Sequence, residues 1–466
     1  MDSETIVAVA TPPGLGAVGV LRLSGPHAVK IADRVFRPLH GSVPLRETKS
    51  HRVRHGLAVF PGTGRVGDEV LVFVARGPRS YTGEDVVEFS CHGGPAPVGA
   101  VLDALVQAGA RPARPGEFTL RAFLNGRMDL SQAEAVSDIV RARSGEALAA
   151  AVAGLQGKLG ERIRASAAEL VDLLAHLEAA LDFDDQEVPP VQPGEVGAAT
   201  ARVERQLREL VSGARAGRLY REGLRVVLAG RPNVGKSSLL NVLTGRDRAI
   251  VTEVPGTTRD PVEDSLVVDG VPVCLVDTAG LRETADRIEA EGVRRAEAAV
   301  EAASVAVLVV DGSAPLTSED FGAARRMPVP AGVVAVNKAD LPQVVEACDV
   351  EALVPGARLV RVSALRGSGL AGFWREVMAA AGLGGEGGSG LEGRQDALVT
   401  SARHEEALRR AIRELEGARV EAGRGGGEEL VAARVRAALR ALGEITGESV
   451  DEEVLAAIFS SFCLGK

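Results

Sequence analysis

The stretch GRPNVGKS, residues 230–237, decides how the middle of this chain folds. It matches the pattern GxxxxGK followed by Ser or Thr, it comes after the apolar run LRVVLA at 224–229, and it opens the helix-forming run SSLLNVLTG at 237–245. A strand, a glycine-rich loop and a helix in this order form a phosphate-binding loop (P-loop), because backbone amides and the helix N-terminus cradle phosphates. We therefore predict that Lys236 reaches the β and γ phosphates of a nucleotide and that Ser237 binds magnesium.

Two further motifs indicate which nucleotide binds. DTAG at 277–280 would bring Asp277 near the magnesium and the amide of Gly280 beside the γ-phosphate. NKAD at 337–340 follows an apolar run, and the carboxylate of Asp340 can accept two hydrogen bonds from N1 and N2 of guanine. Adenine offers no such pattern and would leave the carboxylate unpaired, so the motif predicts GTP.

Other predicted contacts with GTP lie between and after these motifs. GTTRD at 256–260 occupies the place of a first switch segment, and Thr258 is its predicted magnesium ligand; SAL at 363–365 follows another apolar run. The full set of predicted GTP contacts is Asn233, Val234, Gly235, Lys236, Ser237, Ser238, Thr252, Glu253, Val254, Pro255, Gly256, Thr257, Thr258, Asp277, Thr278, Ala279, Gly280, Asn337, Lys338, Asp340, Ser363 and Ala364.

The pattern around these motifs predicts a multidomain protein. Residues 1–118 alternate β-rich runs with short helical stretches and predict an α+β domain, whereas 119–219 are helical. Residues 220–383 alternate strands and helices, as in a Ras-like α/β P-loop GTPase domain. The segment 384–466 begins with a glycine-rich linker and returns to helices before a CLGK tail. We infer that the GTPase domain is inserted into one discontinuous all-α domain.

Composition narrows the class of protein. The chain has 466 residues, 45% of them hydrophobic, and a net charge of −9, which disfavours indiscriminate binding to nucleic acid and requires a local basic patch for any RNA contact. Its four cysteines are far apart, which argues against a disulfide framework and a zinc site. An acidic N-terminus and the lack of an apolar run of roughly 18 residues predict a cytoplasmic protein without a membrane contact.

Two local patterns need a decision between alternatives. GLGAVG at 14–19 matches the dinucleotide-binding fingerprint, but the strand-like VGVLRLSG follows where that fold requires a helix, so we prefer a glycine-rich hairpin turn. SVDE at 449–452 resembles a capping box and predicts the start of the last helix.

The resemblance to a known family covers nearly the whole chain. It is carried by TIVAVATPPGLGAVGVLRLSG, YTGEDVVE, HGGP, RPGEFTLRAFLNGRMDLSQAEA, GRPNVGKSSLLN and the terminal FSSFCLGK, which occur in this order. Together they resemble the family of tRNA modification GTPases called MnmE or TrmE. The P-loop alone would be unspecific, but the N-terminal blocks and the tail are not.

The resemblance implies a homodimer that works with a flavoprotein using FAD and NADH. Such proteins add an aminomethyl or carboxymethylaminomethyl group to C5 of the wobble uridine of certain tRNAs. The one-carbon donor is a tetrahydrofolate derivative, in the 5-formyl or 5,10-methylene form. GTP hydrolysis in this family depends on magnesium and potassium.

The resemblance also implies how water is activated. Leu281 stands where many GTPases carry a glutamine that positions water, and it cannot take that role. In the family a potassium ion supplies the missing charge, and its ligands correspond to Asn233, Thr252, Val254 and Thr257. Loop capping is the alternative role of Asn233. Glu289 corresponds to the glutamate that orients the attacking water, with Glu283 and Glu291 as neighbouring alternatives.

A folate site is implied at the two ends of the chain. The family's folate-binding positions correspond to Arg22, Glu84, Arg127 and Lys466, where a carboxylate suits the donor edge of a pterin and cations suit glutamyl carboxylates. Surface ion pairs are the alternative for each. Cys463 is the tail cysteine, whose thiolate could take part in one-carbon transfer; prenylation and a frayed terminus are its alternatives.

Two rival functions remain at this stage. The chain could be a regulatory GTPase that binds RNA or ribosomes without modification chemistry, but such proteins use dedicated RNA modules such as a KH domain, and we find no convincing one here. Residues 1–118 could alternatively serve only as a folate sensor.

Overall fold

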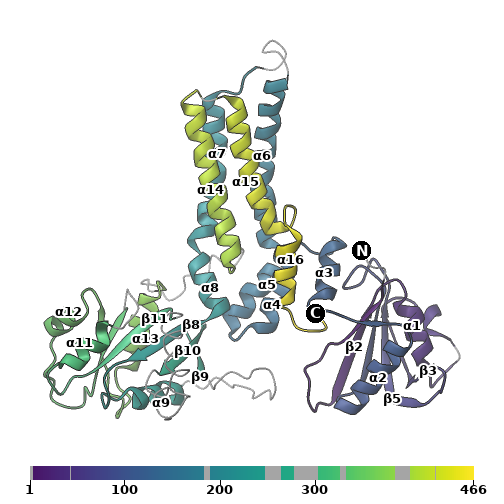
Figure 1. Ribbon diagram of the computed structural model, residues 1–466, viewed down its shortest axis with the longest axis horizontal. Helices are drawn as coiled ribbons and strands as arrows, with labels where there is room; N and C mark the ends of the chain where they lie inside the picture. The colour runs from purple at the N-terminus through teal and green to yellow at the C-terminus, as the bar shows by residue number, and fades with distance from the viewer. Residues whose placement is uncertain are drawn as a thin grey trace.

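Two sheet-containing units flank the lower end of a tall helical bundle in the computed structural model (Figure 1). The structure describes residues 4–41, 43–182, 189–246, 264–277, 303–325, 332–383, 399–425 and 427–466. No helix in these ranges is long and apolar enough to span a membrane. The predicted fold class, an α+β unit, a discontinuous helical unit and an inserted α/β unit, is confirmed.

The N-terminal unit is one seven-stranded sheet in the order β3-β4-β5-β6-β2-β1-β7. Its elements are β1 (Ile6–Val9), β2 (Val18–Ser24), α1 (Ala28–Val35), β3 (Phe36–Pro38), the 3-10 helix η1 (Leu45–Glu47), β4 (Arg52–Val59), β5 (Val66–Ala75), β6 (Val86–His92), α2 (Pro95–Gln107) and β7 (Arg111–Pro112). Alternate side chains of the central strands pack under α1 and α2, among them Leu21, Val72 and Phe89. Because β1 and β2 pair antiparallel, GLGAVG lies in a hairpin, at the end of the connection and the start of β2, and does not form a nucleotide-binding turn.

Two segments distant in the sequence build the helical unit. The first supplies α3 (Glu117–Leu124), α4 (Leu130–Arg141), α5 (Gly145–Leu155), α6 (Lys158–Asp182), α7 (Pro193–Ser212) and α8 (Ala214–Glu222); the second supplies α14 (Ala402–Gly423), α15 (Glu428–Thr446) and α16 (Glu452–Ser460). Apolar residues at three-to-four-residue spacing interlock between them, so that Leu207 of α7 shares a core with Leu408 of α14 and Leu442 of α15.

The inserted unit is a six-stranded sheet in the order β13-β12-β11-β8-β10-β9, parallel except for the β9–β10 hairpin. Its elements are β8 (Leu224–Ala229), α9 (Lys236–Arg246), β9 (Asp264–Val268), β10 (Val271–Asp277), β11 (Val305–Asp311), α11 (Ser318–Arg325), β12 (Val333–Asn337), α12 (Ala347–Leu353), β13 (Arg358–Arg361) and α13 (Leu370–Ala380). The strands β11 and β12 are buried along their whole length, as expected of parallel strands covered on both faces. Their carboxyl ends meet at the edge that carries the P-loop.

The C-terminal tail closes the structure against the first unit. A Cβ at Gly465 would lie 2.5 Å from the carbonyl oxygen of Val9, so the tail passes close to β1. The capping box predicted at 449–452 is wrong: the last helix begins at Glu452, and Asp451 at its N-cap makes no side-chain cap. Ser449 instead lies against Gly443 of α15.

A buried cluster of charges joins the helical unit to the strand that precedes the P-loop. Arg403 and His404 of α14 both pair with Glu134 of α4, at 3.1 and 2.5 Å. One turn further along α4, Asp138 pairs at 2.7 Å with Arg221 of α8, the helix that leads directly into β8. These ion pairs fix the helix from which the inserted unit departs.

Glu134→Gln is expected to cost about 3 kcal/mol of stability at neutral pH, because it leaves the partly buried guanidinium of Arg403 and the buried His404 facing a neutral amide. Burial by itself raises the pKa of Glu134, but His404 and Arg403 outweigh it and lower that pKa to about 2, from 4.5. The stabilisation is therefore present above about pH 4.5 and is lost as the pH falls toward 2. In calorimetry, the Tm difference between parent and variant should shrink over that interval.

The control is Glu406→Gln, which removes an exposed partner of Arg413 on the same helix and should leave Tm nearly unchanged. A Tm difference for Glu134→Gln that stays constant on acidification would contradict the assignment.

Candidate functional site

The P-loop takes a backbone path that only certain residues tolerate. Gly230 has a φ of 151°, and a Cβ there would lie 2.3 Å from the carbonyl oxygen of Val309 on β11. Asn233 adopts the left-handed region at a φ of 64°, which asparagine accepts better than most residues. The loop therefore lies tightly against the sheet before α9 begins at Lys236.

Lys236 lies inside the curve of this loop. Its side chain is 6% exposed, and Nζ donates to the carbonyl oxygens of Gly230 and Arg231 at 2.9 and 2.8 Å. The ammonium group is thus held where the loop backbone turns, beside the N-terminus of α9, whose helix dipole is positive at that end. This arrangement suits a polyphosphate anion.

Asn337 links the phosphate side of the site to the base side. Its Nδ2 donates to the carbonyl oxygen of Val234 at 2.8 Å, and its Oδ1 accepts from the amide of Ala364 at 3.0 Å. Gly235 must be a glycine because a Cβ would lie 2.3 Å from Nδ2 of Asn337. One buried amide therefore sets the P-loop, β12 and the SAL loop relative to one another.

The base-reading residues are held by their own partners. Ser363 donates its hydroxyl to Asp340, a hydrogen bond that lowers the pKa of that carboxyl and keeps it ionised. Lys338, in the left-handed region at a φ of 62°, pairs through Nζ with Asp311 at 2.6 Å. Sequence reasoning missed Asp311, although an acid at the carboxyl end of a wholly apolar strand beside NKAD was an available signal.

Several predicted residues lie outside the described part of the chain. They are Thr252, Glu253, Val254, Pro255, Gly256, Thr257, Thr258, Thr278, Ala279, Gly280 and Glu289, with the alternatives Glu283 and Glu291. The glycine-rich linker at 384–393 lies outside it too. The structure thus assembles the P-loop and the base-reading motifs, and it leaves the switch segments as predictions.

The two residues predicted near magnesium both lie at the P-loop end of the sheet. Ser237 occupies the first turn of α9, and Asp277 ends β10 opposite Leu228, two residues before Gly230. Serine and aspartate are residue types with the hard oxygen donors that magnesium takes together with phosphates, so Ser237 and Asp277 stay the predicted magnesium residues. Over the described ranges, no cluster of three or more His, Cys, Asp or Glu residues suggests a further metal site.

A second polar site lies where the tail meets the N-terminal sheet. Arg22 of β2 donates through Nε to Glu88 at 2.7 Å and through a terminal nitrogen to the carbonyl oxygen of Gly465 at 3.1 Å. Its guanidinium lies 5.1 Å from the ring centre of Tyr81. Burial lowers the pKa of Lys466, and the positive charge of Arg22 nearby lowers it further. The hydrogen bond from Arg22 to Gly465 thus joins two residues that are 443 positions apart in the sequence.

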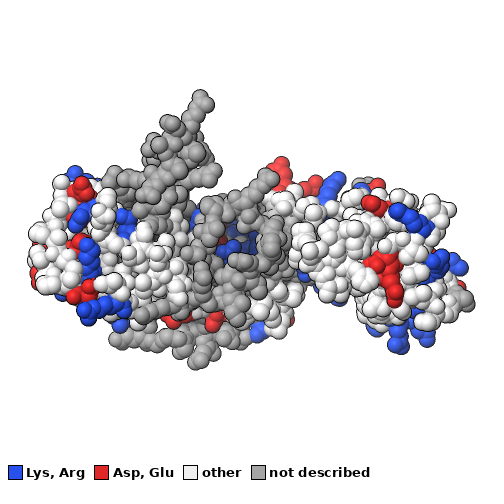
Figure 2. Space-filling model, turned by 90° about the horizontal axis from the view of Figure 1, so that it is seen from below, with Lys and Arg blue, Asp and Glu red and all other residues white. Residues whose placement is uncertain are grey.

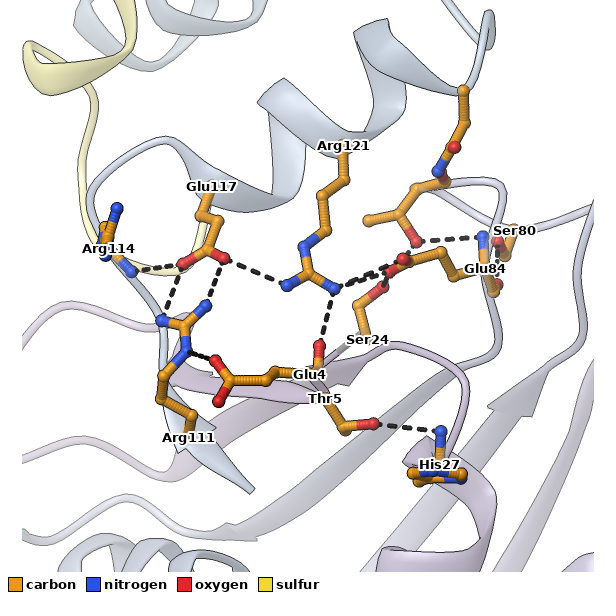
Figure 3. A network of polar contacts seen from close by, with 12 residues as sticks. Glu4, Thr5, Ser24, His27, Ser80, Glu84, Arg111, Arg114, Glu117 and Arg121 are labelled. Carbon is orange, nitrogen blue, oxygen red and sulfur yellow. Dashed lines mark hydrogen bonds and ion pairs between the residues drawn. The ribbon is translucent and has the colours of Figure 1, made fainter. Parts of the chain in front are cut away.

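Glu84 lies in the same region and makes several polar contacts (Figure 3). It accepts from the hydroxyl of Ser24 at 2.7 Å and pairs with Arg121 of α3 at 3.1 Å. Arg121 also pairs with Glu117, which in turn holds Arg111 at 2.7 Å. Sequence reasoning did not single out Arg121 or Glu117, because only the packing of α3 against the sheet brings them to Glu84.

Arg127 borders an open cavity next to these residues. Its Nε donates to the carbonyl oxygen of Ser80 at 3.0 Å. The cavity has a volume of about 350 Å³ and is lined by His51, Phe73, Ala75, Arg79, Ser80, Tyr81 and Arg127. The structure therefore places Arg22 beside Tyr81, and Arg127 and Glu84 both at Ser80, while Lys466 lies near Arg22. Cys463 is exposed on the tail three residues before Lys466.

Comparisons with known proteins give the family. The chain matches the model of the MnmE helical domain over residues 130–463 and the model described as GTP-binding protein TrmE N-terminus over residues 5–127. It is 49% identical over 467 residues to the tRNA modification GTPase MnmE of Symbiobacterium thermophilum and 45% identical over 470 residues to that of Heliobacterium modesticaldum, each time over 100% of both chains. Among solved structures, it resembles the G domain of the T. maritima FeoB iron transporter, with a TM-score of 0.26 and 26% identity over 34% of this chain and 98% of that one.

Proposed function

Since this chain belongs to the family of tRNA modification GTPases MnmE, a GTP hydrolase acting in tRNA modification, we propose that it works as a potassium-activated homodimer. With a flavoprotein partner that uses FAD and NADH, it adds an aminomethyl or carboxymethylaminomethyl group to C5 of the wobble uridine of certain tRNAs. The one-carbon donor is a tetrahydrofolate derivative, and the reaction takes place in the cytoplasm. The proposed domain boundaries divide the chain into residues 1–118, 119–219, 220–383 and 384–466.

The observation that carries the proposal is the pair of sites on one chain. The first is the P-loop joined by Asn337 to a guanine-reading motif, which supports GTP hydrolysis with magnesium. The second is the cationic and acidic site formed by β2, the Glu84 loop and the tail, which suits a ligand with both a donor edge and carboxylates. A regulatory GTPase without modification chemistry would have no use for the second site.

The case for potassium starts from the P-loop. Leu281 offers no group to position water, so another positive charge must stabilise the transition state, where an arginine finger is worth on the order of 10³ to 10⁵ in rate. The left-handed conformation of Asn233 supports a role in binding, because non-glycine residues in this region cluster at ligand-binding loops. We propose that Thr252, Val254 and Thr257 complete the potassium site and that Glu289 orients the water.

GTP turnover by the full chain is expected to fall at least about tenfold when potassium is replaced by sodium at equal ionic strength, since a lost transition-state charge has a large effect. Asn233→Gly should show the low rate in both salts. Glycine is the right substitution, because it keeps the positive φ and removes only the side chain. Asn241→Ala, on the exposed side of α9, is the control and should retain the potassium dependence. Equal parental rates in the two salts would refute the cation mechanism.

The folate proposal rests on Arg22, Glu84, Arg127 and Lys466, with Cys463 as a candidate participant in one-carbon transfer. Arg22 is engaged by the tail and by Glu88, so it can position a ligand without large movement. Lys466 adds a second cation near it. Together they favour a carboxylate-bearing ligand.

Arg22→Met should weaken binding of 5-formyltetrahydrofolate to the full chain at least about tenfold, because one charge-assisted contact of ~1.5 kcal/mol or more is removed. Titration calorimetry measures this directly. Arg37→Met, which changes an exposed arginine on β3 of the same sheet, is the control and should bind as the parent does. Equal affinities of the parent and Arg22→Met would overturn the assignment of Arg22, and no binding by the parent would overturn the folate site.

Contact with tRNA needs only local basic groups in this acidic chain. On the face shown in Figure 2, basic and acidic side chains of the described residues lie in small groups, near the ends of the molecule and also near its middle. We propose that tRNA is recognised by a few positioned contacts, because the net charge of −9 disfavours nonspecific binding along the phosphate backbone.

A further inference from the structure

The P-loop has one anchor whose partner residue lies outside the nucleotide-binding motifs. Two anchors come from the sheet: Gly230 lies against the carbonyl of Val309 on β11, and Val234 accepts from Asn337 at the end of β12. The third is the side chain of Arg231, whose Nε lies 3.2 Å from Oδ1 of Asp320 on α11. It therefore holds the middle of the loop, between the two backbone anchors.

Asp320 is buried, and its two carboxylate oxygens make different contacts. Its side chain is 2% exposed, and Oδ2 accepts from the amide and the hydroxyl of Thr317 at 2.9 and 2.8 Å, which caps the start of α11. Oδ1 makes no hydrogen bond among the described residues, and neither does Nε of Arg231, which lies 3.2 Å from it, so the two form an ion pair. Capping alone would use one oxygen, and the second is aimed at the loop.

α12 offers a matched comparison within the same unit. Asp349, at the third position of α12, accepts from the amide of Glu346 at 2.9 Å, as Asp320 accepts from that of Thr317. Among the described residues, no ion pair joins Asp349 to an arginine, and its printed contact is the cap at Glu346. The additional contact of Asp320 is thus not a requirement of capping.

We propose that Asp320 is a positioning residue for GTP binding, acting on the P-loop through Arg231. The backbone carbonyl of Arg231 also accepts from Lys236 Nζ at 2.8 Å. Arg231 therefore contacts Asp320 through its side chain and the phosphate-binding lysine through its backbone. A fixed loop binds phosphates without first losing conformational freedom, and this gain appears in ground-state binding more than in the chemical step.

The test compares Asp320→Asn, Arg231→Met and the double variant in the full chain, with steady-state GTP hydrolysis and Tm as readouts. Each single variant is expected to raise KM about tenfold and to change kcat less than about threefold. This is the pattern expected when a contact is lost that stabilises the bound ground state and the transition state equally. The KM of the double variant should be no higher than that of the more impaired single variant, because both substitutions break the same interaction. Asp349→Asn is the control and should leave KM unchanged.

Three results would overturn the proposal. A KM within about twofold of the parent for Arg231→Met overturns the proposal, as do additive losses in the double variant, which would make Asp320 a helix cap only. A similar rise in KM for Asp349→Asn also overturns it. If Asp320→Asn does not fold, Arg231→Met decides alone, since it leaves the cap of α11 intact.

Discussion

The amide of Asn337 is the interaction on which the nucleotide site depends. It donates to the P-loop at Val234 and accepts from the SAL loop at Ala364, so the positions of the phosphates and of the base are fixed by one buried group. Gly235 can only be glycine because this amide lies so close. The site can form only once β12 has paired with β11 and brought the NKAD motif to the P-loop.

The helical unit gives this site a defined place in the molecule. Segments on both sides of the inserted unit share one apolar core, and α8 passes from that core into β8, the strand before the P-loop. The ion pair of Arg221 with Asp138 and the cluster around Glu134 hold α4, α8 and α14 together at this exit. At the other side of the bundle, the tail after α16 reaches the N-terminal sheet at Arg22. The helical unit is therefore connected to the nucleotide site through α8 and β8 and to the polar site of the N-terminal sheet through the tail.

Local patterns predicted much of this architecture. The strand, loop and helix around GRPNVGKS, the hairpin at GLGAVG and the helical segments on both sides of the insertion follow from periodicity and turn chemistry, which act over a few residues. The family resemblance pointed to Arg22, Glu84, Arg127 and Lys466; in the structure Glu84 and Arg127 both contact Ser80, and Lys466 lies near Arg22.

Long-range partnerships were not predictable in the same way. Glu134 and Arg403 are 269 positions apart, and nothing local marks Asp320 as the partner of Arg231 or Arg121 as the partner of Glu84. Such pairs are set by how elements pack, because any acid in a charged sequence can serve as a partner. The capping box at 449–452 failed for a related reason: Ser449 packs against α15, and the last helix starts later.

The central claim is that GTP hydrolysis at this P-loop drives wobble uridine modification. The direct measurement is mass spectrometry of tRNA nucleosides from a strain lacking this gene, complemented with the parent chain or with Lys236→Ala. The account predicts that the parent restores the C5-modified uridines and that Lys236→Ala, present at an equal protein level, does not. Full restoration by Lys236→Ala, or no change in these uridines when the gene is absent, would contradict it.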